Sequence, residues 1–119
     1  MKPKGCFALT ILCLIAALPQ AVFAQGGLAK IADNVYAYVD VKNASPSNSF
    51  GANEGVIVGT KGAAVVDTLI SAKEAMRLLA DLRAVTDKPV KYVIDTHSHP
   101  DHALGNCVFE DLGAAIVAH

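Results

Sequence analysis

The sequence lacks the features that identify several large classes of protein. Ten lysines and arginines stand against 11 acidic residues, and the net charge of −1 excludes a strongly basic surface for nucleic acid. The longest apolar stretch, Phe7 to Leu18, is shorter than the roughly 20 residues that a helix needs to cross a membrane. We therefore expect no nucleic-acid partner and no membrane-spanning helix.

The first two dozen residues have the pattern of an export signal. Lys2 and Lys4 precede the apolar stretch, and Val22, Phe23 and Ala24 match the small-x-small pattern that signal peptidase reads. We expect residues 1–24 to be a signal peptide that is cleaved after Ala24. The remaining domain, residues 25–119, is then exported to the periplasm or secreted, without stable association with the membrane.

Cysteine is scarce once the leader is removed. Of the three cysteines only Cys107 remains, so no intramolecular disulfide can stabilise the exported part. We expect Cys107 to be a small buried residue on a short helix rather than a ligand or a nucleophile.

Apolar periodicity and turn residues predict an alternation of strands and helices after residue 30. Ala75, Leu78, Leu79 and Leu82 recur at three- and four-residue steps, as on one face of a helix, and Ser71 with Glu74 forms a possible capping box at its start. The expected order is a turn at 31–34, a strand at 35–39, a hairpin of 55–59 and 63–66, a helix from 71 to about 86, a strand at 90–95, a short helix through Leu104, Val108 and Leu112 closed by Gly113, and a strand at 115–118.

This order predicts an α/β (α+β) fold in which helices cover one face of a sheet. The segment from Lys42 to Gly51 is rich in Asn, Ser and Pro and should be an exposed loop. The longer stretch from Lys42 to Asn53 either contacts a substrate, with Phe50 as its large apolar residue, or serves as a connector. The composition does not distinguish between these two roles.

The main chemical signal is a cluster of histidines after the strand 90–95. His97, His99 and His102 fall within six residues together with Asp101. Residues two apart project to the same side of an extended backbone, so His97 and His99 can face one ion. Pro100 biases His99 away from helical backbone and should keep the segment a rigid loop. Imidazole and carboxylate ligands without nearby thiolates favour an open, catalytic Zn²⁺ site. The alternative is an exposed polar loop that binds metal adventitiously.

The segment from Thr96 to His102 resembles the signature of the metallo-β-lactamase superfamily. The resemblance extends upstream to Val65-Val66-Asp67-Thr68, to Asn53-x-Gly55 before the hairpin, and downstream to Gly105-Asn106. It covers most of residues 30–119. It implies the amino-terminal half of a four-layer αββα metallo-β-lactamase sandwich.

By this resemblance, His97 and His99 bind a first zinc ion, and Asp101 and His102 bind a second, with a hydroxide between the two. Asp101 is thereby both a metal ligand and the residue assigned to catalysis. Asp67 is expected to orient the ligand loop by accepting a hydrogen bond, although an ordinary turn aspartate at a strand end would look the same.

The family completes its metal site with ligands from later segments, which are missing here. His119 follows directly on a strand, in a place where the resemblance expects no ligand. We therefore expect a fragment truncated at its carboxyl end, which binds zinc weakly and has little or no activity.

The resemblance implies a zinc-dependent hydrolase that uses a metal-bound hydroxide on a small-molecule substrate, either a β-lactam or another ester or amide. Two alternatives stay open. The same fold carries iron-dependent redox enzymes, and a family member can also be a non-catalytic zinc-binding module. The sequence says nothing about the oligomeric state.

Overall fold

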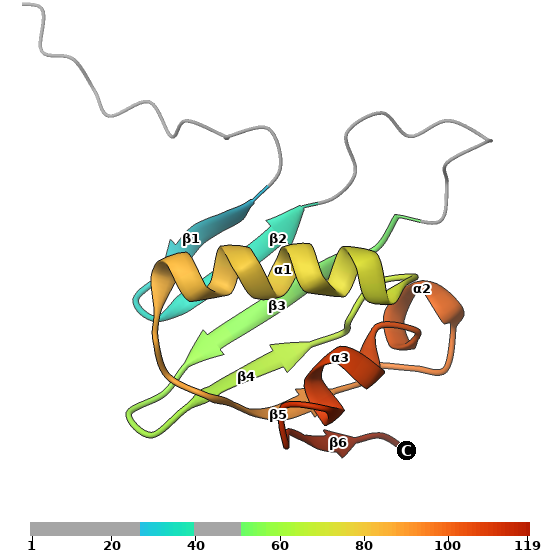
Figure 1. The fold of residues 1–119 in the computed structure, drawn as a ribbon. Helices are drawn as coiled ribbons and strands as arrows, with labels where there is room; N and C mark the ends of the chain where they lie inside the picture. Colours follow the sequence, from blue (N-terminus) through green and yellow to red (C-terminus); the bar gives the residue numbers. More distant parts are fainter. Residues whose placement is uncertain (1–26, 40–50) are drawn as a thin grey trace, which may run out of the picture.

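The computed structural model describes residues 27–39 and 51–119, which form one mixed sheet with helices on one side (Figure 1). The strand order follows the chain. The elements are β1 (Leu28–Ala32), β2 (Val35–Val39), β3 (Asn53–Val58), β4 (Ala63–Val66), α1 (Ala72–Val85), β5 (Val90–Ile94), α2 (Pro100–Ala103), α3 (Asn106–Glu110) and β6 (Ala115–Val117).

The sheet changes from antiparallel to parallel at β4. Strands β1 to β4 pair antiparallel with their neighbours, whereas β4 pairs parallel with β5 and β5 with β6. Helix α1 connects β4 to β5 and returns the chain to the end of the sheet at which β4 began, as a parallel crossover requires. The carboxyl ends of β4 and β5 therefore lie at the same end of the sheet.

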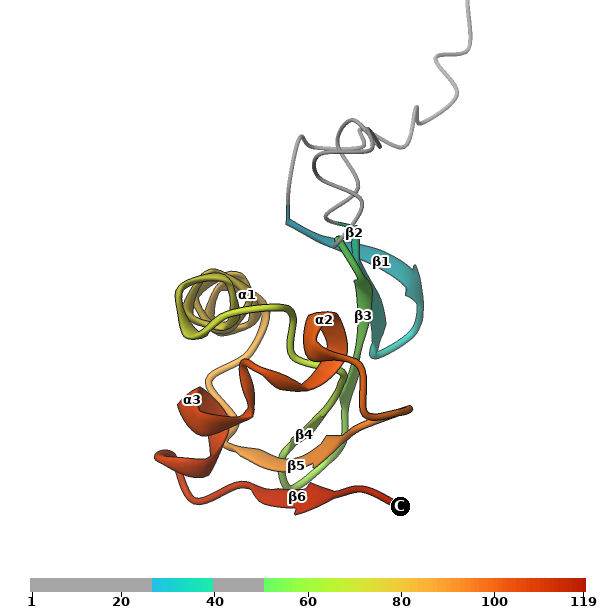
Figure 2. The ribbon, with the colours of Figure 1, turned by 90° about the vertical axis from the view of Figure 1, so that its right-hand side faces the viewer.

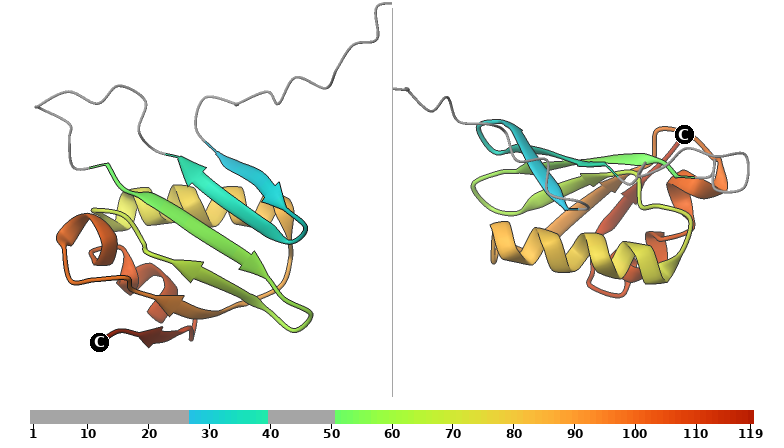
Figure 3. Two further views of the ribbon diagram at one scale, coloured as in Figure 1. Left: turned by 180° about the vertical axis from the view of Figure 1, so that it is seen from behind. Right: turned by 90° about the horizontal axis from the view of Figure 1, so that it is seen from above.

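The helices cover one face of the sheet only (Figures 2 and 3). Val56, Val65 and Val93 are paired across β3, β4 and β5 and are fully buried. They belong to the same core as the buried side of α1, which consists of Ala75, Leu78, Leu79 and Leu82. This core fixes the position of the loops that follow β4 and β5.

The opposite face of the sheet is apolar and uncovered by any described residue. Ile57, Ala64 and Tyr92 form a row across β3, β4 and β5, and the next row contains Val66 and Ile94. Tyr92 is 52% exposed and Ile57 is 46% exposed. An uncovered patch of large apolar side chains is uncommon on a soluble domain and marks a contact surface.

Most of the expected elements are confirmed, and three expectations are wrong. Residues 31 and 32, expected in a turn, end the strand β1, and the turn is confined to Asp33 and Asn34. The histidine segment does not stay a loop throughout, because α2 begins at Pro100. Cys107 lies on the short helix α3 as expected but is exposed, because that helix buries Phe109 instead.

The capping box of α1 is half formed. Ser71 is the N-cap, and its hydroxyl accepts from the backbone N–H of Glu74 (3.3 Å). In the described part of the chain, the Glu74 side chain makes no return hydrogen bond with the backbone N–H of Ser71. The expected signal peptide, residues 1–24, and most of the segment 42–53 lie outside the described residues. Within the described part of the chain, no helix has the length and apolar character to span a bilayer.

Candidate metal centre

The histidine cluster and Asp67 meet at the carboxyl ends of β4 and β5. Asp67 directly follows β4, and its backbone N–H donates to the carbonyl of Ile94, the last residue of β5 (3.0 Å). The parallel pairing thus places Asp67 beside the segment that starts at Thr96, 29 residues further along the chain. The expected proximity of Asp67 to the ligand loop is present.

The turn after β4 is conformationally strained. Asp67 has a φ of 61° and Leu69 a φ of 70°, values that non-glycine residues seldom adopt and that are least tolerated by bulky side chains. Such strain persists only where surrounding contacts determine the backbone, and it gathers at functional sites. Here the turn aims the Asp67 carboxylate toward the histidine segment.

Asp67 is a buried carboxylate with several donors, and it is 4% exposed. Its Oδ1 accepts from the backbone N–H of Thr96 (2.8 Å), and its Oδ2 lies 2.8 Å from the Thr96 hydroxyl and 2.8 Å from His102 Nδ1. Burial alone would raise the pKa of the Asp67 carboxyl, but the bonds from Thr96 and His102 outweigh it and hold the pKa below its usual value. Asp67 is therefore ionised at neutral pH.

His102 is held at both its ring and its backbone. Its carbonyl accepts from the backbone N–H of Thr68 (2.7 Å), while its ring bonds to Asp67. The other ring nitrogen, Nε2, lies 3.5 Å from Asp101 Oδ2. Two of the expected ligands thus come together on α2.

Helix α2 places these two residues. His99 is its N-cap with extended backbone (φ −68°, ψ 145°), and Pro100 stands at the first helical position. Proline is favoured there because the first-turn N–H is unpaired in any helix, so the residue that keeps His99 extended also starts the helix. The expected effect of Pro100 on His99 is confirmed, although the chain winds up directly afterwards.

Three of the four histidine rings lie close together beyond the carboxyl ends of β4 and β5. The His97 ring centroid lies 4.7 Å from that of His99 and 4.0 Å from that of His102. His119 follows β6 and makes no ring contact with the other three. In residues 27–39 and 51–119, no three His, Cys, Asp or Glu side chains are arranged so that they could hold a metal ion. An ion would have to enter between rings that now pack on one another.

The Asn106 side chain forms a hydrogen-bonded bridge beside the histidine cluster that the sequence did not predict. Asn106 accepts from the Thr68 hydroxyl (2.7 Å) and donates to Asp95 Oδ2 (2.8 Å). An amide can do both at once, so it joins the ends of β4 and β5 to the start of α3. Gly105 allows the close approach, because a Cβ there would overlap the Thr68 carbonyl oxygen.

Sequence reasoning also missed Thr96 and Thr68 as site residues. Each was included in a motif, but its hydroxyl was assigned no partner. The available signal was a hydroxyl residue directly beside Asp67 and another directly before His97, at two strand ends that meet in the sheet.

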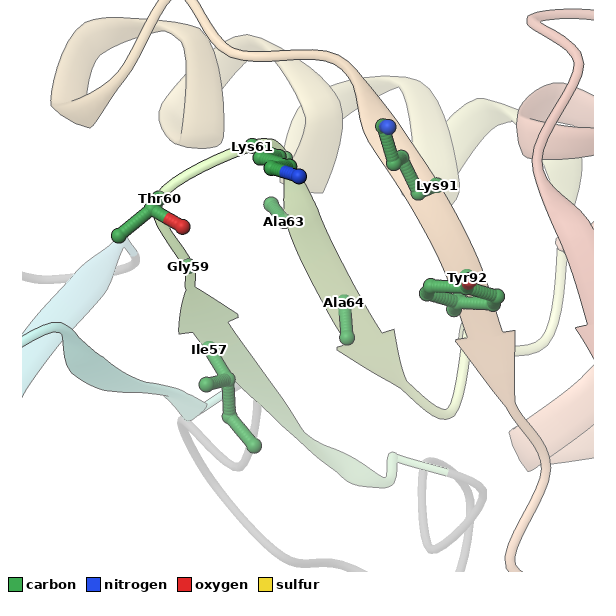
Figure 4. A pocket seen from close by; sticks show the side chains of 9 residues that line it. Ile57, Gly59, Thr60, Lys61, Ala63, Ala64, Lys91 and Tyr92 are labelled. Carbon is green, nitrogen blue, oxygen red and sulfur yellow. The ribbon is translucent and has the colours of Figure 1, made fainter.

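A surface hollow lies at the other end of the sheet (Figure 4). Ile57, Ala64 and Tyr92 contribute to it from the uncovered face, and Lys61 and Lys91 stand at the amino ends of β4 and β5. It is therefore separate from the histidine cluster, which follows the carboxyl ends of those strands.

Comparison with known proteins identifies one family. The model of the metallo-beta-lactamase superfamily matches residues 49–119. A linear primary-alkylsulfatase from a Pseudomonas species is 40% identical over 50 residues, which make up 42% of this chain and 10% of that protein.

Solved structures share the fold. A metallo-beta-lactamase from Erythrobacter litoralis matches with a TM-score of 0.65 and 23% identity over 82% of this chain and 42% of its own. The metallo-beta-lactamase FIM-1 from Pseudomonas aeruginosa, in its mono-zinc form, matches with a TM-score of 0.63 and 17% identity over 78% of this chain and 41% of its own. The sec-alkylsulfatase Pisa1 from Pseudomonas sp. matches with a TM-score of 0.59 and 23% identity over 76% of this chain and 14% of its own. The chain thus spans less than half of each of these proteins.

Proposed function

The chain belongs to the metallo-beta-lactamase superfamily, and on that premise we propose that it supplies half of the zinc-binding active site of an exported hydrolase. Its six-stranded mixed sheet matches part of the family fold, as expected from the sequence. His97 and His99 are the proposed ligands of one ion, and Asp101 and His102 those of a second. The remaining ligands are proposed to come from residues beyond this chain.

One observation carries the proposal: the buried Asp67 carboxylate holds the ring of His102 in place. A carboxylate that orients an imidazole through one nitrogen and leaves the other free is the usual support of a histidine that binds metal. The donor set of three imidazoles and one carboxylate also suits zinc. The residue types therefore suit the ion, and binding requires the packed rings of His97, His99 and His102 to separate.

Zinc, when bound, would make a water molecule acidic enough to ionise near neutral pH and would polarise the bond to be cleaved. The residues of this chain have preparatory tasks. Asp67 orients His102, Thr68 fixes the His102 backbone, and Pro100 starts the helix that brings Asp101 beside it. The strained turn after β4 keeps these groups in place before a substrate arrives.

The substrate class is proposed to be either β-lactams or sulfate esters. The solved relatives include metallo-beta-lactamases, and the curated relative with 40% local identity is a linear primary-alkylsulfatase. Both reactions are hydrolyses that the same pair of ions can serve, so the ligands alone do not separate them.

The test is a comparison of both activities in the longest product that the gene encodes. Hydrolysis of a chromogenic cephalosporin and release of sulfate from dodecyl sulfate would be measured with zinc present. His97→Ala and His99→Ala should abolish whichever activity is found, whereas the control Thr60→Val, in the distant β3–β4 turn, should keep it. Activity that survives both histidine changes would refute the assignment.

The metal itself decides between the two enzyme classes. Elemental analysis of the purified protein should find zinc. Bound iron together with oxygen uptake would support the redox alternative, and stoichiometric zinc without turnover of any ester, amide or lactam would support a binding module. For the 119-residue chain alone we expect weak zinc retention after dialysis and little or no turnover.

Export is part of the proposal. Cleavage after Ala24 would leave a mature product that starts at Gln25 and carries the partial domain 25–119. Amino-terminal sequencing of the protein from the periplasmic or culture fraction should find Gln25. An intact Met1 in the cytoplasmic fraction would contradict both the leader and the location.

A further inference from the structure

We propose that Thr96, acting with Asp67, sets the tautomer of His97, so that His97 and His102 both carry their proton on Nδ1 and both present Nε2 to a metal ion. This proposal rests on the proposed metal site. It adds a positioning residue, Thr96, and a definite chemical state for two of the ligands.

The argument begins with the Asp67 carboxylate, whose oxygens face a backbone N–H, a hydroxyl and an imidazole nitrogen, all within 3.0 Å. Carboxylate oxygens accept hydrogen bonds. Its partners must therefore donate. His102 Nδ1 lies 2.8 Å from Asp67 Oδ2, so it carries a proton, and in a neutral ring Nε2 is then unprotonated.

The Thr96 hydroxyl carries a single proton, and its surroundings determine where that proton points. Oγ1 lies 2.8 Å from Asp67 Oδ2 and 3.0 Å from Oδ1. Turning the proton away would set oxygen lone pairs against a carboxylate at these distances, which is repulsive. The hydroxyl therefore donates to Asp67.

The same hydroxyl oxygen lies 3.0 Å from His97 Nδ1. Because its proton is directed at Asp67, Oγ1 can only accept from His97, so Nδ1 of His97 carries the proton. One carboxylate thus fixes two rings, His102 directly and His97 through a hydroxyl. The two rings lie 4.0 Å apart, centroid to centroid.

His99 provides a comparison inside the molecule. No hydrogen bond reaches its ring from the described residues, so nothing equivalent fixes its tautomer. We expect His99 to exchange between both neutral forms while His97 and His102 hold one.

The experiment is long-range ¹H–¹⁵N NMR of the full chain at about pH 8, above the usual histidine pKa of about 6.5, without metal. The spectrum tells protonated from unprotonated ring nitrogens. In the unaltered chain, His97 and His102 should carry the proton on Nδ1. In Thr96→Val, His97 should lose this preference while His102 keeps it. Thr96→Ser should restore the original pattern, and Thr60→Val should not alter it.

Either of two results would overturn the proposal: His97 protonated on Nε2 in the unaltered chain, or an unchanged His97 pattern in Thr96→Val. Backbone amide spectra of each variant identify one that fails to fold. If Thr96→Val fails to fold, Thr96→Ala, which also removes the hydroxyl, makes the same test.

Zinc titration adds a second readout. Removing a residue that orients a metal ligand commonly weakens binding by about 10- to 100-fold, so Thr96→Val should bind zinc more weakly by such a factor and Thr96→Ser should not. Equal zinc affinity in Thr96→Val and Thr96→Ser would contradict a role of the Thr96 hydroxyl in zinc binding. If the longest product that the gene encodes bound no zinc, the proposed function would fail, while the NMR result would still decide the tautomer.

Discussion

Asp67 combines near-complete burial with a full negative charge. Among the described residues, it is balanced by donors from Thr96 and His102 rather than by a lysine or arginine. Carboxylates that accept several hydrogen bonds keep a low pKa even when burial opposes ionisation. The sequence indicated a supporting role for Asp67, but its two partners depend on the parallel pairing of β4 with β5.

The lowered pKa of Asp67 predicts a specific acid sensitivity. Because the folded carboxyl has a lower pKa than the unfolded one, near 3.9, unfolding takes up a proton between the two values. The stabilisation is complete above the unfolded pKa and is lost as the pH falls through the folded pKa. Urea midpoints measured from pH 6 downward should therefore fall less steeply below about pH 4 in Asp67→Asn than in the unaltered chain.

The exposed pair of Lys30 and Asp33 provides the control for this measurement. The pKa of Asp33 is also lowered, by its hydrogen bond to Lys30 (2.9 Å) and the charge of that lysine. Both side chains face solvent, where screening leaves such pairs little effect on stability. Asp33→Asn should keep the acid profile of the unaltered chain, and a profile like that of Asp67→Asn would contradict the explanation.

Gly105 is required for space rather than for backbone conformation. Its φ is −88°, which any residue can adopt, but an added Cβ would overlap the Thr68 carbonyl and the Ala75 side chain. We expect Gly105→Ala to destabilise the fold by about 3 kcal/mol, as measured by urea unfolding, and to loosen the hydrogen bonds of Thr68.

Gly113 gives the matching case of conformation without crowding. It has a φ of 83°, and a Cβ added there would meet no other atom within 4 Å. Asparagine tolerates this backbone, so Gly113→Asn should cost less than about 1 kcal/mol. Equal losses in Gly105→Ala and Gly113→Asn would show that close packing is not the reason for Gly105.

At the scale of elements, periodicity predicted the hairpin, α1 and β5 well. These segments have a strong local pattern and clear boundaries, such as Ser71 before α1 and Pro89 before β5. Strand β1 was missed because Leu28–Ala32 contains one β-branched residue, and its conformation depends on pairing with β2. Helix α2 was missed because four residues are too few to show a helical period.

The candidate site divides in the same way. The candidate ligands could be recognised because His97, His99, Asp101 and His102 are close in sequence. The supporting bonds were not, because they join residues such as Thr68 and Asn106, 38 positions apart, and exist only once the sheet has formed.

The start of α1 provides a prediction at this scale. Ser71→Ala removes the side chain that accepts from the Glu74 N–H and should cost about 1 kcal/mol of unfolding free energy. Ser71→Asp keeps an acceptor at the N-cap and should retain most of the stability in the same urea titration. If the two substitutions were equally harmful, the cap would not be the cause.

For the whole molecule, the uncovered apolar face is the feature with the widest effect. The rows containing Ile57, Tyr92 and Ile94 lie opposite the helices, and among the described residues the sheet has only one covered face. A sheet this apolar on both sides normally packs between two layers. The single chain therefore presents a surface suited to association.

We predict that the isolated chain associates as its concentration rises and binds a hydrophobic dye. Ile57→Thr combined with Tyr92→Thr should reduce both effects in sedimentation velocity and dye fluorescence, because threonine keeps the strand preference while adding a hydroxyl. Met76→Gln, on the exposed side of α1, removes an apolar side chain elsewhere and should change neither. Association that persisted in the double variant would exclude this face as its cause.

The placement of the histidine cluster at one edge of the sheet leaves the β3–β4 turn, residues 59–62, far from the chemistry. Thr60 and Lys61 are exposed there and lie on a connection between two strands that needs no ligand. A dye or a tether to a solid support, attached at this turn, would leave the proposed metal-binding end of the sheet accessible to solvent. The β3–β4 turn is thus a suitable attachment point for optical or immobilised assays of zinc uptake.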